Sequence, residues 1–197
     1  MIVYSLGMNK RLEDIGEIIL GHTFREAIVD VPTGNYAILQ AKNIGREGVV
    51  ATDDLVSTLL EGTKTNALVY KEDVILSNRG TFRAAVFNDN RHNVLAASSV
   101  YIIRIHNREQ CLPEYLAIFL NSHEGQNLLE GMNRGTIIKS LPKRSLSELF
   151  VPIPSLATQK TVISIYKNFH SRAALYERKF RLEEAVANQS ISSLISQ

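Results

Sequence analysis

The sequence predicts an α+β fold in two parts: a sheet-rich domain with packed helices over residues 1–154, and a long coiled-coil helix over residues 155–197. Three observations predict this division. Short apolar runs separated by turn residues fill the first part. A helical pattern that opens with Pro113 follows these runs. From Leu156 to the last residue there is neither glycine nor proline, and apolar residues recur at a helical spacing.

Four apolar runs predict strands in the first part. YAILQA (36–41) follows the turn Pro32–Asn35, which is typical of a buried strand. Three more runs, each bounded by turn residues or rich in β-branched residues, predict a sheet-rich core. They are DVILS (73–77), RAAVF (83–87) and SSVYIIRI (98–105).

The segment 112–131 predicts one helix or two packed on the sheet. Pro113 suits a first helical turn, and Glu114 favours that end electrostatically. A break is expected near Gly125, and Gly131 is expected to end the helical pattern. The domain boundary is placed at Pro152-Ile153-Pro154, because two prolines lack the backbone donors that a helix or a β-ladder uses.

The last segment carries a heptad repeat. Its apolar residues step by 4, 3, 4, 3 and 4, a spacing typical of a helix that packs lengthwise on another helix. We call these residues the seam: Val162, Tyr166, Phe169, Ala173, Tyr176 and Phe180. The next position is Glu183, so the seam weakens there, although Leu182 and Val186 continue an apolar pattern in a shifted register. A helix of about 35 residues is roughly 50 Å long, which predicts a partner helix from another chain.

Composition narrows the class of protein. The net charge of +2 gives no general affinity for polyanions, so any nucleic-acid contact depends on where the cations lie. The single cysteine excludes an internal disulfide and a cysteine-rich zinc site. The N-terminus does not resemble a signal peptide and no apolar run reaches the roughly 18 residues of a membrane span, so we expect a soluble cytoplasmic protein with no membrane partner.

No catalytic motif is present. The sequence contains no HExxH, GxSxG or GxxxxGK[ST] pattern, and its five histidines are scattered. Asp53, Asp54 and Asp73 would need further ligands to hold a metal, and none is predicted. Cys111 precedes the expected helix and is either a buried structural thiol, the favoured interpretation, or a thiol whose pKa a helix N-terminus lowers. The chain is therefore expected to be neither an enzyme nor a metalloprotein.

Polar segments predict binding instead. Arg134, Lys139, Lys143 and Arg144 follow the turn Gly131–Thr136 with no acid before Glu148. Cationic side chains and the Thr136 hydroxyl near free backbone N–H groups suit phosphate oxygens. The alternative interpretation is a solvated surface loop.

A second polar segment, Ser77-Asn78-Arg79-Gly80, ends an apolar strand, and Gln40 and Lys42 end another. Arginine bonds guanine bidentately and asparagine bonds adenine in the same manner, so these side chains are candidates for base-edge or nearby backbone contacts. A polar turn between strands is the alternative. The full set of candidate DNA contacts is Gln40, Lys42, Ser77, Asn78, Arg79, Arg134, Thr136, Lys139 and Lys143.

The order of several stretches resembles the specificity (S) subunits of type I restriction–modification systems. The final block is the most specific of them. The stretches are LEDIGEII (12–19) with Gly21 and Thr23, LQAKNI (39–44), DVILSNRG (73–80), LPEYL (112–116) through LNS (120–122), GTII (135–138) with Leu141, and LFVPIP (149–154) with Gln159.

The resemblance implies a target-recognition domain that contacts one half of a split double-stranded DNA site, followed by a conserved helix. It implies no cofactor on this chain, because a partner methyltransferase subunit binds S-adenosylmethionine and methylates adenine, and a restriction subunit can join it. Family members usually carry two recognition domains and two long helices, whereas this chain carries one of each. We therefore expect a half-length form that dimerises through antiparallel seams. An adaptor or decoy that occupies the methyltransferase without touching DNA is the alternative.

Overall fold

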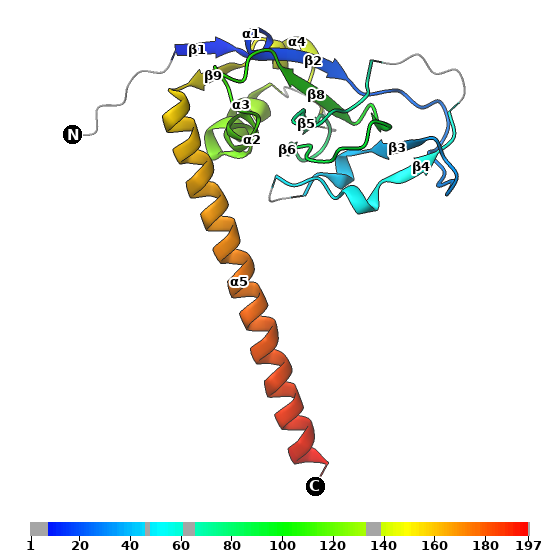
Figure 1. Ribbon diagram of the computed structural model, residues 1–197, viewed down its shortest axis with the longest axis vertical. Coiled ribbons are helices and arrows are strands. Elements are labelled where there is room, and N and C mark those ends of the chain that lie inside the picture. Colours follow the sequence, from blue (N-terminus) through cyan, green and yellow to red (C-terminus); the bar gives the residue numbers. More distant parts are fainter. Residues whose placement is uncertain (1–7, 46–47, 61–65, 133–138, 197) are drawn as a thin grey trace, which may run out of the picture. The chain divides into compact units, whose positions relative to one another are not determined.

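The computed structural model describes residues 8–45, 48–60, 66–132 and 139–196. The chain divides into two compact units, Met1–Lys160 and Thr161–Gln197, which we call the head and the tail (Figure 1). The sequence placed the boundary six residues earlier, after Pro154. None of the described helices is both long enough and apolar enough to cross a membrane. The α+β fold class predicted from the sequence is confirmed.

The head contains a four-stranded antiparallel sheet in the order β2-β8-β5-β6. The long strand β8 pairs with β2 on one side and with β5 on the other (Figure 1). Buried Val, Ile, Leu and Ala side chains fill β5 and β6, as expected for strands covered on both faces. The strands are β2 (Gly16–Leu20), β5 (Val74–Ser77), β6 (Ala84–Val86) and β8 (Val100–Ile105).

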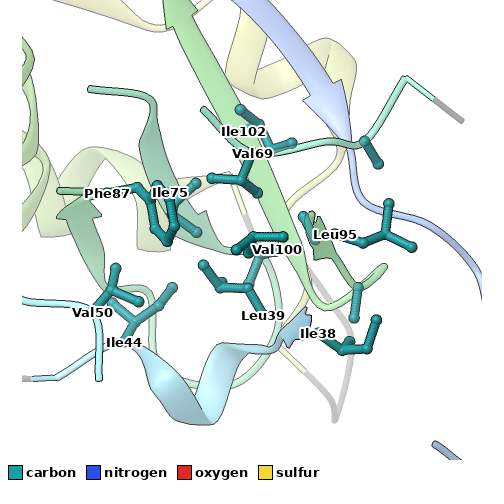
Figure 2. Packing of buried hydrophobic residues seen from close by; sticks show 14 of the residues in the cluster. Ile38, Leu39, Ile44, Val50, Val69, Ile75, Phe87, Leu95, Val100 and Ile102 are labelled. Carbon is teal, nitrogen blue, oxygen red and sulfur yellow. The ribbon is translucent and has the colours of Figure 1, made fainter. Parts of the chain in front are cut away.

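A second sheet of three strands has the order β4-β3-β7, in which β3 pairs antiparallel with β4 and parallel with β7. The core lies between the two sheets, because its cluster draws Leu39 and Leu95 from the small sheet and Ile75 and Ile102 from the large one (Figure 2). Phe87 is its largest fully buried side chain. The strands are β3 (Tyr36–Leu39), β4 (Val56–Thr58) and β7 (Val94–Ala96).

Each of the four predicted strands is present, but they belong to two sheets. The run at 36–41 becomes β3 in the small sheet, and its last residue starts the short 3₁₀ helix Ala41–Asn43. The other three runs become β5, β6 and β8. The sequence prediction missed β1 (Met8–Arg11), β2, β4 and β7. Of these, β4 and β7 have three residues each and no apolar run bounded by turn residues was recognised there.

Two helices, not one, follow the sheet. They are α2 (Pro113–Asn121) and α3 (His123–Gly131), so Gly131 ends the helical segment as predicted. The break falls at Ser122 and not near Gly125, because the Ser122 hydroxyl caps α3 by accepting from the Gly125 backbone N–H at 3.1 Å. Gly125 has a different role: a Cβ there would lie 2.1 Å from the Phe119 carbonyl oxygen.

The proline-rich segment is a strand, which corrects the prediction of an irregular stop. Strand β9 (Phe150–Ile153) pairs antiparallel with β1 (Met8–Arg11), and Pro152 lies opposite Asn9. A two-stranded ladder tolerates a proline because its outer edge needs no backbone donor. The Pro152 carbonyl accepts a hydrogen bond of 2.7 Å from the Tyr115 hydroxyl, which joins this ladder to α2. Two short helices, α1 (Leu12–Ile15) and α4 (Lys143–Ser147), complete the head.

Helix α5 (Leu156–Ile195) starts in the head and is anchored there by Gln159. The Gln159 side chain is fully buried. Its Oε1 accepts from the Leu112 N–H at 2.9 Å, and its Nε2 donates to the carbonyls of Gln110 and Pro154 at 2.7 and 2.9 Å. Three of the four hydrogen-bonding sites of the Gln159 side chain, both donors and one acceptor, therefore bond backbone atoms of the head.

The rest of α5 forms the tail, and the predicted long helix is confirmed with 40 residues. At 1.5 Å per residue the helix is about 60 Å long. Half of its seam residues are solvent-exposed: Phe169, Tyr176 and Phe180 expose 67, 65 and 67 % of their surface. The other three, Val162, Tyr166 and Ala173, are half-buried. A monomeric soluble protein rarely leaves such a row of aromatic side chains in water.

Candidate nucleic-acid interface

The turn between β7 and β8 holds two of the predicted binding segments together. Ser98 and Ser99 form this turn. The Asn78 backbone N–H donates to the Ser99 carbonyl at 3.0 Å, and the Asn78 Nδ2 donates to the Ser98 carbonyl at 2.9 Å. On the other side, the Ala41 N–H donates to the Ser99 hydroxyl at 3.1 Å. The ends of β3 and β5 are thus fixed against the same turn.

The third binding segment joins them by backbone pairing. Leu141 N–H donates to the Asn78 carbonyl at 2.9 Å, and Gly80 N–H donates to the Lys139 carbonyl at 3.0 Å. Arg79 and Ser140 form an antiparallel bridge between these bonds. The Tyr101 hydroxyl donates to the Leu141 carbonyl at 2.8 Å and so adds a side-chain bond that holds this segment in place. Residues about 60 positions apart in sequence, Arg79 and Lys139, are therefore neighbours on the head.

Two of the predicted base contacts are buried in this arrangement. Ser77 is 1 % exposed, and its hydroxyl donates to the Thr81 carbonyl at 2.6 Å and accepts from the Arg83 N–H at 2.7 Å. Asn78 is 5 % exposed and braces the Ser98 turn. In this conformation neither side chain is accessible to a base edge, and both fit a role in positioning Arg79.

The brace at Asn78 leaves one polar atom without a partner. Its Oδ1 is buried, and no described group donates to it. A buried acceptor without a donor is unfavourable by about 1–3 kcal/mol, so this position retains an asparagine at some expense in stability. A leucine at this position would remove that penalty but also the bond to the Ser98 carbonyl.

Arg79 is the exposed member of the turn. It is followed by Gly80, whose φ of +72° lies in the left-handed region that favours glycine. The Arg79 charge also reaches Tyr101: burial raises the pKa of the Tyr101 hydroxyl, and Arg79 partly opposes that rise. The sharp turn at Gly80 thus presents a guanidinium at the surface above a buried, hydrogen-bonded phenol.

The described lysines and arginine of the basic segment differ in whether they form an ion pair with an acidic side chain. Lys139 forms an ion pair with Glu130 at 2.8 Å, with both side chains about half exposed. Arg144 pairs with Glu148 at 3.5 Å across one turn of α4. Exposed pairs of this kind stabilise a protein by about 0–1 kcal/mol, so they exchange readily for a phosphate. Lys143 is exposed at the start of α4. Arg134 and Thr136 lie outside the described residues.

Gln40 and Lys42 line a groove next to the serine turn, which we call the Ser98 groove. Its volume is about 510 Å³. The Gln40 N–H donates to the Asn43 Oδ1 at 2.9 Å, which fixes the bend that carries both side chains. Lys42 is exposed and Gln40 half-buried. The lining consists of Phe24, Glu26, Ala27, Ile28, Gln40, Ala41, Lys42, Val56, Ala97, Ser98 and Ser99.

Sequence reasoning missed several residues of this interface. Ser98 and Ser99 were assigned to the strand 98–105, but they form the turn that joins the predicted segments. Glu26 belongs to none of the motifs identified in the sequence. The pair of serines just before a β-branched strand was the available sequence signal, and such a pair is too common to distinguish this turn from others.

The thiol of Cys111 does not have an activated environment. The side chain is 1 % exposed, and burial raises its pKa to about 12. The favoured interpretation of a buried structural thiol is confirmed, and the alternative of a pKa lowered by the helix N-terminus is wrong because desolvation dominates. Within the described ranges, no group of three or more His, Cys, Asp or Glu side chains is placed to share a metal ion.

Comparison with known proteins supports the resemblance seen in the sequence. The model of the type I restriction modification DNA specificity domain family matches residues 7–183. None of the curated proteins matches the chain significantly.

Solved structures share the fold. A structure described as showing complex assembly and conformational transition of the type I R-M system has a TM-score of 0.64 at 16 % identity. The S subunit from M. genitalium and the HsdS subunit from Thermoanaerobacter tengcongensis have TM-scores of 0.58 and 0.59, each at 15 % identity. These matches cover 90, 87 and 90 % of this chain but only 42, 41 and 40 % of the solved chains. The chain thus spans about two fifths of their length.

Proposed function

Because the chain belongs to the type I restriction modification DNA specificity domain family, we propose that it is a non-catalytic DNA-recognition subunit. Its head contacts one half of a split double-stranded site, and two copies pair through their seams to contact both halves. The assembly directs a partner adenine methyltransferase, on which S-adenosylmethionine binds, and a restriction subunit can join. One observation carries the proposal: the Ser98 turn gathers the predicted binding segments at adjacent positions of the head.

The proposed contacts divide by chemistry. Lys139 and Lys143 neutralise phosphates, because both are exposed cations beside the Arg79 turn, and the Lys139–Glu130 pair opens when a phosphate competes. Arg79, Gln40 and Lys42 approach base edges or the neighbouring backbone. Ser77 and Asn78 act indirectly by holding Arg79 in place.

Salt-dependent binding tests the DNA contact. We expect the full-length chain to bind a random duplex in fluorescence anisotropy, with an affinity that falls steeply as salt rises. Lys139→Ala should lower affinity for all sequences alike and reduce the salt slope by about 1. Lys71→Ala is the matched control, because Lys71 precedes β5 whereas Arg79 follows it, at the opposite end of the strand.

A second function is an adaptor that occupies the methyltransferase through the tail. One observation favours it: ion pairs to acids engage Lys139 and Arg144. The exposed part of the seam is compatible with either function. The duplex titration separates the two functions. A parent chain that binds no duplex at low salt, with or without its methyltransferase, would contradict DNA recognition and leave the adaptor.

A further inference from the structure

The Ser98 groove contains an acidic side chain, which is unexpected on a surface that faces DNA. Glu26 lines it together with Gln40, Lys42, Ser98 and Ser99. Glu26 is exposed, and no ion pair or hydrogen bond engages its carboxylate among the residues that the structure describes. A carboxylate here repels phosphates and therefore weakens binding that depends on charge alone.

The chemistry of the base edges limits what such a carboxylate can bind. In the major groove, cytosine presents the N4 amino group and adenine the N6 amino group, and both donate hydrogen bonds. The O6 and N7 of guanine and the O4 of thymine are acceptors and repel a carboxylate. An ionised carboxyl group is only an acceptor, so it discriminates between these two classes of base.

The two sides of the groove differ in the residues that line them. Lys42 is exposed on the bend after β3 and suits a phosphate, whereas the Ser98 turn lies on the side where Asn78 holds the Arg79 turn. The groove therefore adjoins the proposed base-contacting segment.

We propose that Glu26 is a specificity-determining residue whose carboxylate accepts a hydrogen bond from the exocyclic amino group of one base in the target. This inference rests on the proposed function. The groove's acid thus raises specificity in two ways: it binds cytosine N4 or adenine N6, and it disfavours non-specific binding to the phosphate backbone.

A selection from random duplexes tests the inference. The full-length chain is incubated with a library of duplexes that carry a random insert, the bound fraction is sequenced, and the parent is compared with Glu26→Ala and Glu109→Ala. Both variants lose one exposed negative charge. Glu109 follows the C-terminal end of β8, whereas the Ser98 turn precedes its N-terminal end, so it serves as the matched control.

We expect the parent to enrich a motif with cytosine or adenine at one position that Glu26→Ala makes indifferent, because alanine has no hydrogen-bond acceptor, with about tenfold loss of preference there and no change elsewhere. The base identity at that position distinguishes N4 from N6. Glu26→Ala should also bind random duplex more tightly, and Glu109→Ala should keep the parent motif.

Two outcomes overturn the inference, and they differ from one another. If Glu26→Ala keeps the preference at every position, Glu26 has no role in specificity although the proposed function stands. If the parent itself enriches no sequence, the proposed function fails and this inference fails with it.

Discussion

The head and the tail bury their apolar side chains in opposite ways. In the head, Ile102 at the centre of β8 is fully buried between two sheets (Figure 2). In the tail, Ile191 on α5 exposes 53 % of its surface, and Phe169, Tyr176 and Phe180 expose more. Isoleucine is thus packed inside the protein in the head and exposed to solvent in the tail. The head therefore buries its apolar side chains within its own fold, whereas the tail leaves apolar side chains of α5 exposed.

The largest expected effect is a difference in the free energy of unfolding between variants of Ile102 and of Ile191. Ile102→Ala should lower the free energy of unfolding of the head by about 2–5 kcal/mol, because it leaves a cavity in a packed core. Ile191→Ala should change the free energy by less than about 0.5 kcal/mol in a dilute sample. Urea denaturation followed by circular dichroism measures both. Equal losses in the two variants would show that the tail packs within its own chain.

The next largest effect is expected on the affinity of the proposed dimer, after a substitution in the seam. Phe180→Ala should weaken the proposed dimer about 30-fold, which corresponds to about 2 kcal/mol, because buried aromatic residues dominate such interfaces. Head stability should not change. Arg178→Ala, at a position off the seam, is the control for lost helix-surface contacts. Sedimentation equilibrium at micromolar concentration measures the affinity, and a parent that stays monomeric alone and with its methyltransferase would contradict pairing through the seam.

The smallest effect concerns the head at alkaline pH. Burial raises the pKa of Cys111 from 9.0 to about 12 and that of Tyr115 from 10.0 to about 12. Above pH 9 the unfolded thiol loses its proton while the folded thiol keeps it, so the unfolded state binds fewer protons and stability falls as pH rises.

Cys111→Ala should remove about 1 kcal/mol of this loss between pH 9 and pH 10, with little change in the slope at neutral pH. Urea midpoints across the pH range measure it. An identical alkaline decline in parent and variant would show that the thiol does not titrate in this range.

The sequence predicted the elements of this molecule better than their pairing. Alternation and β-branched residues identified β3, β5, β6 and β8, and the heptad identified α5, because these signals are local. The assignment of β3 to a separate sheet depends on the parallel pairing of Ile38 with Leu95, a contact that no local pattern encodes. Pro152 misled the prediction because its tolerance depends on the missing neighbour at the edge of β9.

The candidate interface shows the same limit. Residue type alone made Asn78 and Arg79 equal candidates, and only the Ser98 turn separates them into a buried brace and an exposed cation. The closeness of Lys139 to Arg79 arises from backbone bonds across about 60 residues of sequence, through Gly80 and Leu141. Glu26 became visible only when the groove brought it beside Gln40.

The anchor of α5 is indifferent to the side chains around it. Gln159 bonds only the main-chain atoms of Gln110, Leu112 and Pro154. Those three positions can therefore change identity without loosening the joint, provided that the loop keeps its path. Gln159 itself has no such latitude, since few side chains place one acceptor and one two-proton donor in a sealed space. The start of α5 is thus held by one side chain whose chemistry is required and by backbone atoms of residues whose side chains can differ.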